Sequence, residues 1–252
     1  MIICTGVYLK AKIIIGRDTR TSGSFVLSSF VSGATMGGAT VIDAGILPTP
    51  AISFLVEHLK ADFGVMITAS HNPPEYNGIK IFDCTGKKIS SKLENQIELN
   101  FAKQYIEKNK KFGKYIIKPK LYRTYLEHLA SCVNLSLKGL NIVLDCSNGA
   151  TGVTAKRVFE KLGAKVFAFF AHTDGRQINC GCGATNPHFL ADKVKQLGCN
   201  AGFCFDGDGD RVVAIDENGC IANGDKILYI LAKHKLEQNK LDPKVVAGTF
   251  YT

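Results

Sequence analysis

The sequence lacks the features that mark several large classes of protein. No apolar run approaches the roughly 20 residues that a membrane-spanning helix needs. Residues 1–12 are too short, and too polar in their second half, for a secretory signal peptide. There is no RNA-binding aromatic signature and no basic zipper. These absences argue against membrane, secreted and nucleic-acid-binding proteins, and they favour a cytoplasmic location.

Cysteine is present, but without the spacing of a disulfide framework or a zinc site. The nine cysteines are odd in number and irregularly spaced. Cys180 and Cys182 have no second cysteine or histidine pair at zinc-site spacing. Cys204 lies within an apolar run. We therefore expect reduced, buried thiols of a cytosolic protein and no structural zinc.

The charge is strongly positive, with a net value of +9. Such a balance fits nucleic acid, a membrane surface or a small anionic substrate. Many of the lysines fall in one polar stretch, residues 103–120. We interpret this stretch as an exposed helix face followed by a connection, so the charge by itself decides little about the partner.

Hydrophobic periodicity alternates between short strands and longer helices. The expected strands are residues 12–15, 40–43, 63–67, 79–82, 141–144, 165–169, 201–205, 212–215 and 245–247. The expected helices are residues 22–36, 48–59, 93–108, 121–132, 150–162, 187–197 and 224–236. Strands separated by helices of this length predict parallel α/β sheets. The pattern restarts after the lysine-rich stretch, which predicts two similar α/β units that divide near residues 115–120.

One polar loop follows the expected strand at residues 63–67, where open α/β sheets place their ligands. The loop offers the hydroxyl of Ser70, the imidazole of His71, an amide and the ammonium of Lys80. A serine next to a histidine is not a hydrolase pair by itself, because adjacent side chains seldom face each other. From chemistry alone, a polar turn without a catalytic role remains open.

A second segment places three carboxylates at alternate positions with only glycine between them: Asp206, Asp208 and Asp210. Their mutual repulsion calls for a cation, and oxygen-only ligands select a hard ion such as Mg²⁺. A calcium EF-hand loop fails at its sixth position, where Arg211 stands instead of glycine. A phosphatase with an aspartate nucleophile fails at Asp210, where threonine or valine is expected. An acidic turn without a metal remains the alternative.

A third segment, residues 16–23, carries Arg17, Arg20 and three hydroxyls between a strand and a helix start. It is able to hold an anion. It fits equally well as a helix start in which Asp18 pairs the arginines. Taken together, a hydroxyl nucleophile, a site for a hard cation and positive side chains are the parts that phosphoryl transfer needs.

Two of these segments resemble loops of a known family. Residues 68–73, Thr-Ala-Ser-His-Asn-Pro, resemble the phosphoserine loop of the α-D-phosphohexomutase superfamily. Residues 206–211, Asp-Gly-Asp-Gly-Asp-Arg, resemble its metal loop. Residues 16–18 and 77–80 also match family positions, and the resemblance covers essentially the whole chain.

The resemblance implies an enzyme that interconverts sugar 6-phosphates and 1-phosphates. Ser70 is implied to carry a phosphoryl group that shares Mg²⁺ with Asp206, Asp208 and Asp210. It would pass this group to one sugar oxygen and then take back the other phosphate of a bisphosphorylated intermediate.

The resemblance also assigns roles to positively charged and ionisable residues. His71 and Lys80 are implied to assist proton transfer and orientation, and Arg17 is implied to act at the catalytic site. Arg211 and Arg20 are expected to orient the phosphate.

Residues 179–187, Asn-Cys-Gly-Cys-Gly-Ala-Thr-Asn-Pro, resemble a segment of the phosphoglucosamine mutase branch. The expected reaction is therefore glucosamine 6-phosphate to glucosamine 1-phosphate, a step toward UDP-N-acetylglucosamine. The alternatives are a phosphomannomutase or phosphoglucomutase, or an inactive fragment that binds metal and phosphate. The expected partner is a phosphorylated hexose or hexosamine.

The resemblance finally implies a domain organisation. Residues 1–117 correspond to an α/β/α domain I without its first strand, and residues 118–242 to an α/β/α domain II. Residues 243–252 correspond to the start of a third domain. We expect two consecutive three-layer α/β/α units with mixed, mostly parallel sheets, in a chain truncated at both ends.

Overall fold

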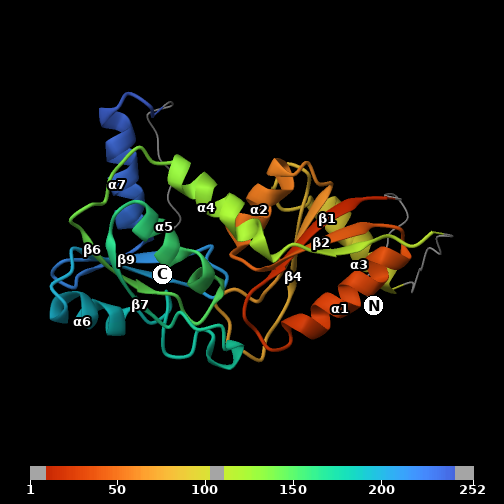
Figure 1. The fold of residues 1–252 in the computed structure, drawn as a ribbon, viewed down its shortest axis with the longest axis horizontal. Helices are drawn as coiled ribbons and strands as arrows, with labels where there is room; N and C mark the ends of the chain where they lie inside the picture. The colour runs from red at the N-terminus through yellow and green to blue at the C-terminus, as the bar shows by residue number, and fades with distance from the viewer. Residues whose placement is uncertain (1–9, 103–110, 242–252) are drawn as a thin grey trace.

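The computed structural model describes residues 10–102 and 111–241, which form two lobes that are each built on one sheet (Figure 1). The predicted strand at residues 245–247 and the predicted third unit lie outside the described residues. No helix in the described ranges combines the length and the apolar character that crossing a membrane requires.

The first sheet has the strand order β4-β3-β1-β2-β5. Its strands are β1 (Lys12–Arg17), β2 (Thr40–Ile46), β3 (Phe63–Ile67), β4 (Ile79–Phe82) and β5 (Tyr115–Ile117). All neighbours pair in parallel except β3 and β4, which are antiparallel. The helices are α1 (Gly23–Met36), α2 (Thr49–His58) and α3 (Ser91–Ala102).

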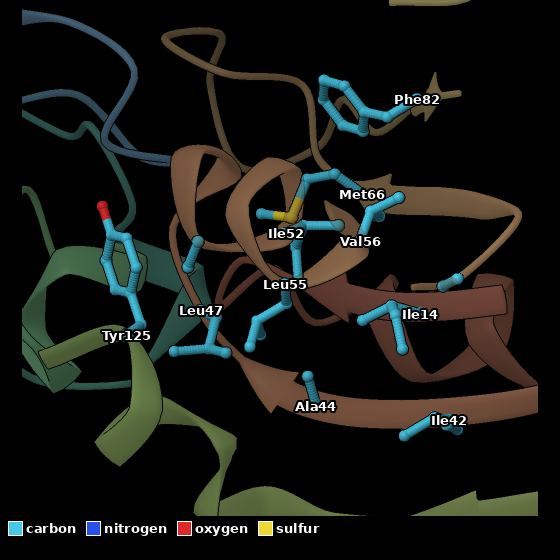
Figure 2. Close-up of a cluster of buried hydrophobic side chains, with 12 residues drawn as sticks. Ile14, Ile42, Ala44, Leu47, Ile52, Leu55, Val56, Met66, Phe82 and Tyr125 are labelled. Atoms are coloured by element: carbon cyan, nitrogen blue, oxygen red, sulfur yellow. The ribbon is translucent and has the colours of Figure 1, made fainter. Parts of the chain in front are cut away.

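Helices α1 and α2 cover opposite faces of this sheet (Figure 1). The alternation of side chains along β1 explains why two faces need covering. Ile13 and Ile15 pack into a cluster with Leu27 of α1. Ile14 points the other way, into the cluster around Ile52 of α2 that Figure 2 shows. The sheet is therefore the middle of three layers.

The second sheet has the order β10-β9-β8-β6-β7. Its strands are β6 (Asn141–Asp145), β7 (Lys165–Phe169), β8 (Ala201–Phe205), β9 (Val212–Asp216) and β10 (Ile221–Ala222). Strand β6 is parallel to β7 and β8, whereas β9 is antiparallel to β8 and β10. The helices include α5 (Ala155–Lys161), which follows the short 3-10 helix Ala150–Val153, α6 (His188–Gln196) and α7 (Gly224–Glu237). A second short 3-10 helix, Gly175–Gln177, follows β7. The predicted class, two α/β units with mixed and mostly parallel sheets, is confirmed.

The lysine-rich stretch is only partly the exposed connection that its sequence predicts. Residues 103–110 lie outside the described residues, but Tyr115–Ile117 forms the edge strand β5. Three residues among lysines are too few to show a period of two. This strand is stabilised by backbone pairing of Tyr115 with Val41 and of Ile117 with Asp43, both on β2.

Helix α4 (Tyr122–Ser131), which follows the 3-10 helix Pro119–Leu121, lies between the two lobes (Figure 1). It packs against α2 on one side and α5 on the other. Tyr125 belongs to the buried cluster on the α2 side of the first sheet, and His128 stacks on Phe54 of α2 with ring centroids 4.0 Å apart. The predicted domain boundary at residues 117 and 118 stays a prediction.

Candidate active site

Ser70 lies in the loop after β3 with its backbone held in a left-handed conformation, at φ +51°. This conformation costs a non-glycine residue about 1–3 kcal/mol, so the surroundings must enforce it. The Ser70 backbone N–H donates to the Thr68 hydroxyl over 2.8 Å, and that hydroxyl donates to Asp18 over 2.6 Å. Asp18 is buried, and its burial raises the pKa of its carboxyl, outweighing the hydrogen bond from Thr68 and the charge and hydrogen bonds of Arg20. Hydrogen bonds through Thr68 to the buried Asp18 therefore hold the loop in place.

Arg20 holds the same loop from within. Its Nε donates to Asp18 over 2.9 Å, and both side chains are fully buried. The two remaining nitrogens donate to four loop carbonyls, those of Ser70 (2.9 Å), Asn72 (2.8 Å), Tyr76 (2.8 Å) and Pro73. A guanidinium has five N–H donors, and all are used here. Arg20 thus positions the loop, and it has no free donor for the phosphate contact predicted from the sequence.

Asn179, from the other lobe, completes this support. Its Nδ2 donates to the carbonyl of Ser70 over 2.9 Å and to that of Asn72 over 3.0 Å. Its own backbone has a positive φ of +60°, which asparagine tolerates better than most residues. The sequence marked Asn179 only as part of a branch-specific segment, because a contact between distant loops leaves no local pattern.

The three aspartates follow β8, where the chain turns back toward β9. Gly209 makes the turn possible with φ +67°. One carboxylate oxygen from each of Asp206, Asp208 and Asp210 lies within 4.8 Å of the other two. The Ser70 hydroxyl donates to Asp206 Oδ2 over 2.7 Å and lies 3.5 Å from Asp210 Oδ1. The structure thus brings the predicted nucleophile and the predicted carboxylates together from separate sheets.

Lys80, on β4, reaches the same cluster. Its ammonium lies 2.7 Å from Asp208 Oδ2 and 2.7 Å from Asp210 Oδ2. Partial burial lowers the pKa of Lys80, but the hydrogen bonds and charges of the two aspartates outweigh it, and the net shift is upward. Lys80 is therefore a cation in this arrangement.

The aspartate cluster has two properties of a cation site. Asp208 is completely buried, and its Oδ1 has no hydrogen-bond donor among the described residues. Burial, together with the charge of Asp208, raises the pKa of Asp206 to about 6. Both properties show carboxylate charge that nearby protein donors do not fully balance. The cluster suits a divalent metal ion, since hard cations prefer such oxygens.

The side chains of the other predicted residues make no hydrogen bond to the cluster among the described residues. Arg17 Nη1 is 3.5 Å from Asp43 Oδ1. The side chain of Arg211 is exposed, while its backbone N–H donates to Asp206 Oδ1 over 3.1 Å. His71 Nδ1 is buried and has no hydrogen-bond partner in the described part of the chain. Their predicted roles remain predictions.

Asp145, at the end of β6, is a buried carboxylate that the sequence did not single out. It accepts the backbone N–H groups of Ser147 and Gly183, each over 2.8 Å. The Ser147 carbonyl in turn accepts the backbone N–H of Asn179 over 3.0 Å. Asp145 therefore orders the loops that carry Asn179 to the Ser70 loop.

We predict that Asp145 makes stability depend on pH. Burial raises its pKa from 3.8 to about 6, against the two backbone hydrogen bonds. Between about pH 4 and 6 the folded chain then binds more protons than the unfolded chain, so the free energy of unfolding falls as pH rises, by on the order of 3 kcal/mol for this group. When the free energy of unfolding in urea is measured at several pH values in this window, it should fall less steeply with pH for Asp145→Asn than for the parent. Equal slopes would contradict the prediction.

Comparison with known proteins finds one family for both lobes. Its model described as phosphoglucomutase/phosphomannomutase, alpha/beta/alpha domain I, matches residues 3–108. The model for alpha/beta/alpha domain II matches residues 123–219.

Individual relatives agree with these matches. A phosphoglucosamine mutase of Clostridium kluyveri is 44% identical over 252 residues, which is 98% of this chain and 56% of the relative. Another from Thermotoga neapolitana is 44% identical over 249 residues, 96% of this chain and 56% of the relative. A crystal structure of a phosphoglucomutase/phosphomannomutase family protein from Burkholderia thailandensis superposes with a TM-score of 0.80 at 28% identity, over 91% of this chain and 51% of that one. The chain spans about half the length of the curated relatives it matches.

Proposed function

Because the chain belongs to the phosphoglucomutase/phosphomannomutase family of α-D-phosphohexomutases, we propose that it acts as a phosphosugar mutase converting glucosamine 6-phosphate to glucosamine 1-phosphate. One observation carries the proposal: the Ser70 hydroxyl, from the first lobe, donates to Asp206 of the aspartate cluster in the second over 2.7 Å. The phosphoglucosamine mutases among the relatives support the choice of sugar.

In the proposed reaction, Ser70 carries the phosphoryl group in the resting protein. A sugar hydroxyl attacks the phosphorus, a new P–O bond forms to the sugar, and the bond from phosphorus to Ser70 Oγ breaks. The sugar hydroxyl loses its proton and Ser70 Oγ gains one. The bisphosphorylated sugar then turns over, and the reverse step returns its other phosphate to Ser70.

The aspartates supply the cation site for this reaction. We propose that Asp206, Asp208 and Asp210 hold Mg²⁺, which neutralises charge on the phosphoryl oxygens when bound. Lys80 adds a positive charge 2.7 Å from two of these carboxylates. It is placed to supply a proton near the reacting oxygens, and His71 next to Ser70 assists in orientation.

The arginines divide into two groups under this proposal. Arg17 and Arg211 are free to turn toward phosphate, since within the described part of the chain the side chain of Arg17 makes one long polar contact and that of Arg211 is exposed. Arg20 acts through the loop that it holds. We also propose that residues 1–117 and 118–242 are the two domains, with the reaction taking place between them.

The cellular setting follows from the same proposal. All eight cysteines among the described residues are free thiols, which supports a reducing compartment such as the cytoplasm. The partner we propose is a phosphorylated hexosamine, and no nucleic-acid or membrane partner is proposed.

A turnover assay tests the proposal. The chain is incubated with Mg²⁺, a catalytic amount of hexosamine bisphosphate and, in parallel, the 6-phosphates of glucosamine, glucose and mannose. Phosphorus NMR should show the 1-phosphate form fastest from glucosamine 6-phosphate. Faster conversion of glucose or mannose 6-phosphate would favour the sister branch. Phosphoryl uptake on Ser70 without turnover would favour a binding fragment. The absence of both uptake and turnover would contradict the proposal.

A further inference from the structure

The two carboxylate oxygens of Asp208 have unequal surroundings. Oδ2 accepts from the hydroxyl of Thr49 and lies 2.7 Å from the ammonium of Lys80. Oδ1 is buried and has no donor among the described residues. Because only one of its two oxygens has hydrogen-bond donors among the described residues, the carboxylate is held in one orientation.

Thr49 reaches Asp208 from the other lobe. It is the first residue of α2 and is 7% exposed. Its backbone N–H also donates to the Asp208 carbonyl over 2.8 Å. Pro48 and Pro50 flank it and fix the start of the helix. Two hydrogen bonds from one rigid helix end thus hold both the backbone and the side chain of Asp208.

These two bonds have different consequences. The backbone bond joins the lobes but does not involve the carboxylate of Asp208. The hydroxyl bond goes to the carboxylate itself, and a hydroxyl has one proton to donate. While the Thr49 hydroxyl donates to Oδ2, this oxygen is directed toward Thr49 and Lys80, and Oδ1 is the oxygen left for a cation.

We propose that Thr49 is a positioning residue for the cation site, one that orients Asp208 across the boundary between the two lobes. The inference rests on the proposed function in one respect, that the aspartate cluster binds a divalent cation. It adds a residue outside both sequence motifs, and it makes cation affinity depend on how the two lobes meet. Groups that orient a metal ligand typically change metal affinity by about 10- to 100-fold when they are removed.

Titration with Mn²⁺ alone, followed by electron paramagnetic resonance and calorimetry, tests the inference. Thr49→Val removes the hydroxyl at nearly constant shape, and we expect about 10- to 100-fold weaker Mn²⁺ binding. Thr49→Ser keeps the hydroxyl and should bind nearly as the parent does. Thr85→Val is the matched control, because Thr85 donates to Asp83 over 2.7 Å in an exposed turn away from the site. It should leave the affinity unchanged.

Each result decides between the two proposals. A parent chain that binds no Mn²⁺ overturns the proposed cation site, and with it this inference. If the parent binds and Thr49→Val binds equally well, only the inference fails. It also fails if Thr49→Ser binds Mn²⁺ as weakly as Thr49→Val does, because packing rather than the hydroxyl is then responsible.

Circular dichroism checks the fold of each variant, and Thr49→Ala replaces Thr49→Val if valine prevents folding. At saturating Mg²⁺, phosphoryl uptake on Ser70 should recover in the valine variant, as expected for weakened binding.

Discussion

Replacing Ser70 with alanine should leave the chain without a covalently bound phosphoryl group and lower phosphoryl transfer by roughly a thousandfold or more. The reason is that a covalent carrier has no substitute in the loop. His71 lies next to Ser70 in sequence, but the hydroxyl that donates to Asp206 is that of Ser70. The alanine side chain retains no atom that can form the bond to phosphorus.

Intact mass spectrometry after incubation with hexosamine bisphosphate and Mg²⁺ measures this loss directly. The parent chain should gain the mass of one phosphoryl group, and peptide mapping should place it on Ser70. Ser29→Ala is the matched control, because Ser29 is a partly exposed serine on α1 whose hydroxyl donates to a carbonyl of its own helix. It should take up phosphate as the parent does. Equal uptake by Ser70→Ala would contradict the assignment.

Replacing Arg20 with methionine should lower the free energy of unfolding by about 3–5 kcal/mol, the usual cost of breaking a buried ion pair. Methionine keeps much of the length of the side chain but removes every donor. Asp18 would lose its partner in a buried site, and its pKa is already raised by burial. The carbonyls of the Ser70 loop would lose the donors that Arg20 supplies.

The chain contains a second arginine pair with the same spacing, which provides the control. Arg176 lies 2.9 Å from Asp174, two residues before it, but the arginine side chain is 76% exposed. Arg176→Met should leave the urea midpoint unchanged, since exposed pairs contribute little. The two variants therefore compare one sequence pattern in two environments. Similar midpoints for Arg20→Met and Arg176→Met would show that the buried pair does not stabilise the fold.

Arg20→Met should also reduce phosphoryl uptake if enough of the chain remains folded, because the left-handed conformation of Ser70 loses one of its supports. A chain that unfolds more easily but takes up phosphate at the parent rate would limit Arg20 to stability. This readout separates a positioning role from a purely structural one.

Much of the fold was predictable because its signals are local. The expected strand at residues 63–67 matches β3, and the residues expected as strand at 201–205 match β8. In both, a short apolar run is followed at once by polar or glycine-rich chain. Strand β5 was missed for the opposite reason: Tyr115–Ile117 is a strand because β2 lies beside it, and that neighbour is about seventy residues away in the sequence.

The candidate site shows the same division. Ser70 and the aspartates were predicted, since loops after buried strands are where α/β sheets place ligands. Asn179, Asp145 and Thr49 were not predicted as members of the site. Each acts through one or two hydrogen bonds to a residue in a distant loop. Such contacts produce no recognisable motif in the local sequence.

Arg17 and Arg20 show why chemistry alone could not complete the assignment. Both stand in one segment, and both were expected to act on phosphate. The structure buries Arg20 beneath the loop with all five donors used, while Arg17 remains partly exposed beside Asp43. The sequence by itself determined the α/β class, the family and the residues of the two loops, because those depend on periodicity and on local motifs. Only the tertiary structure decided which side chains meet between the lobes, because a hydrogen bond depends on distance in space and not on separation along the chain.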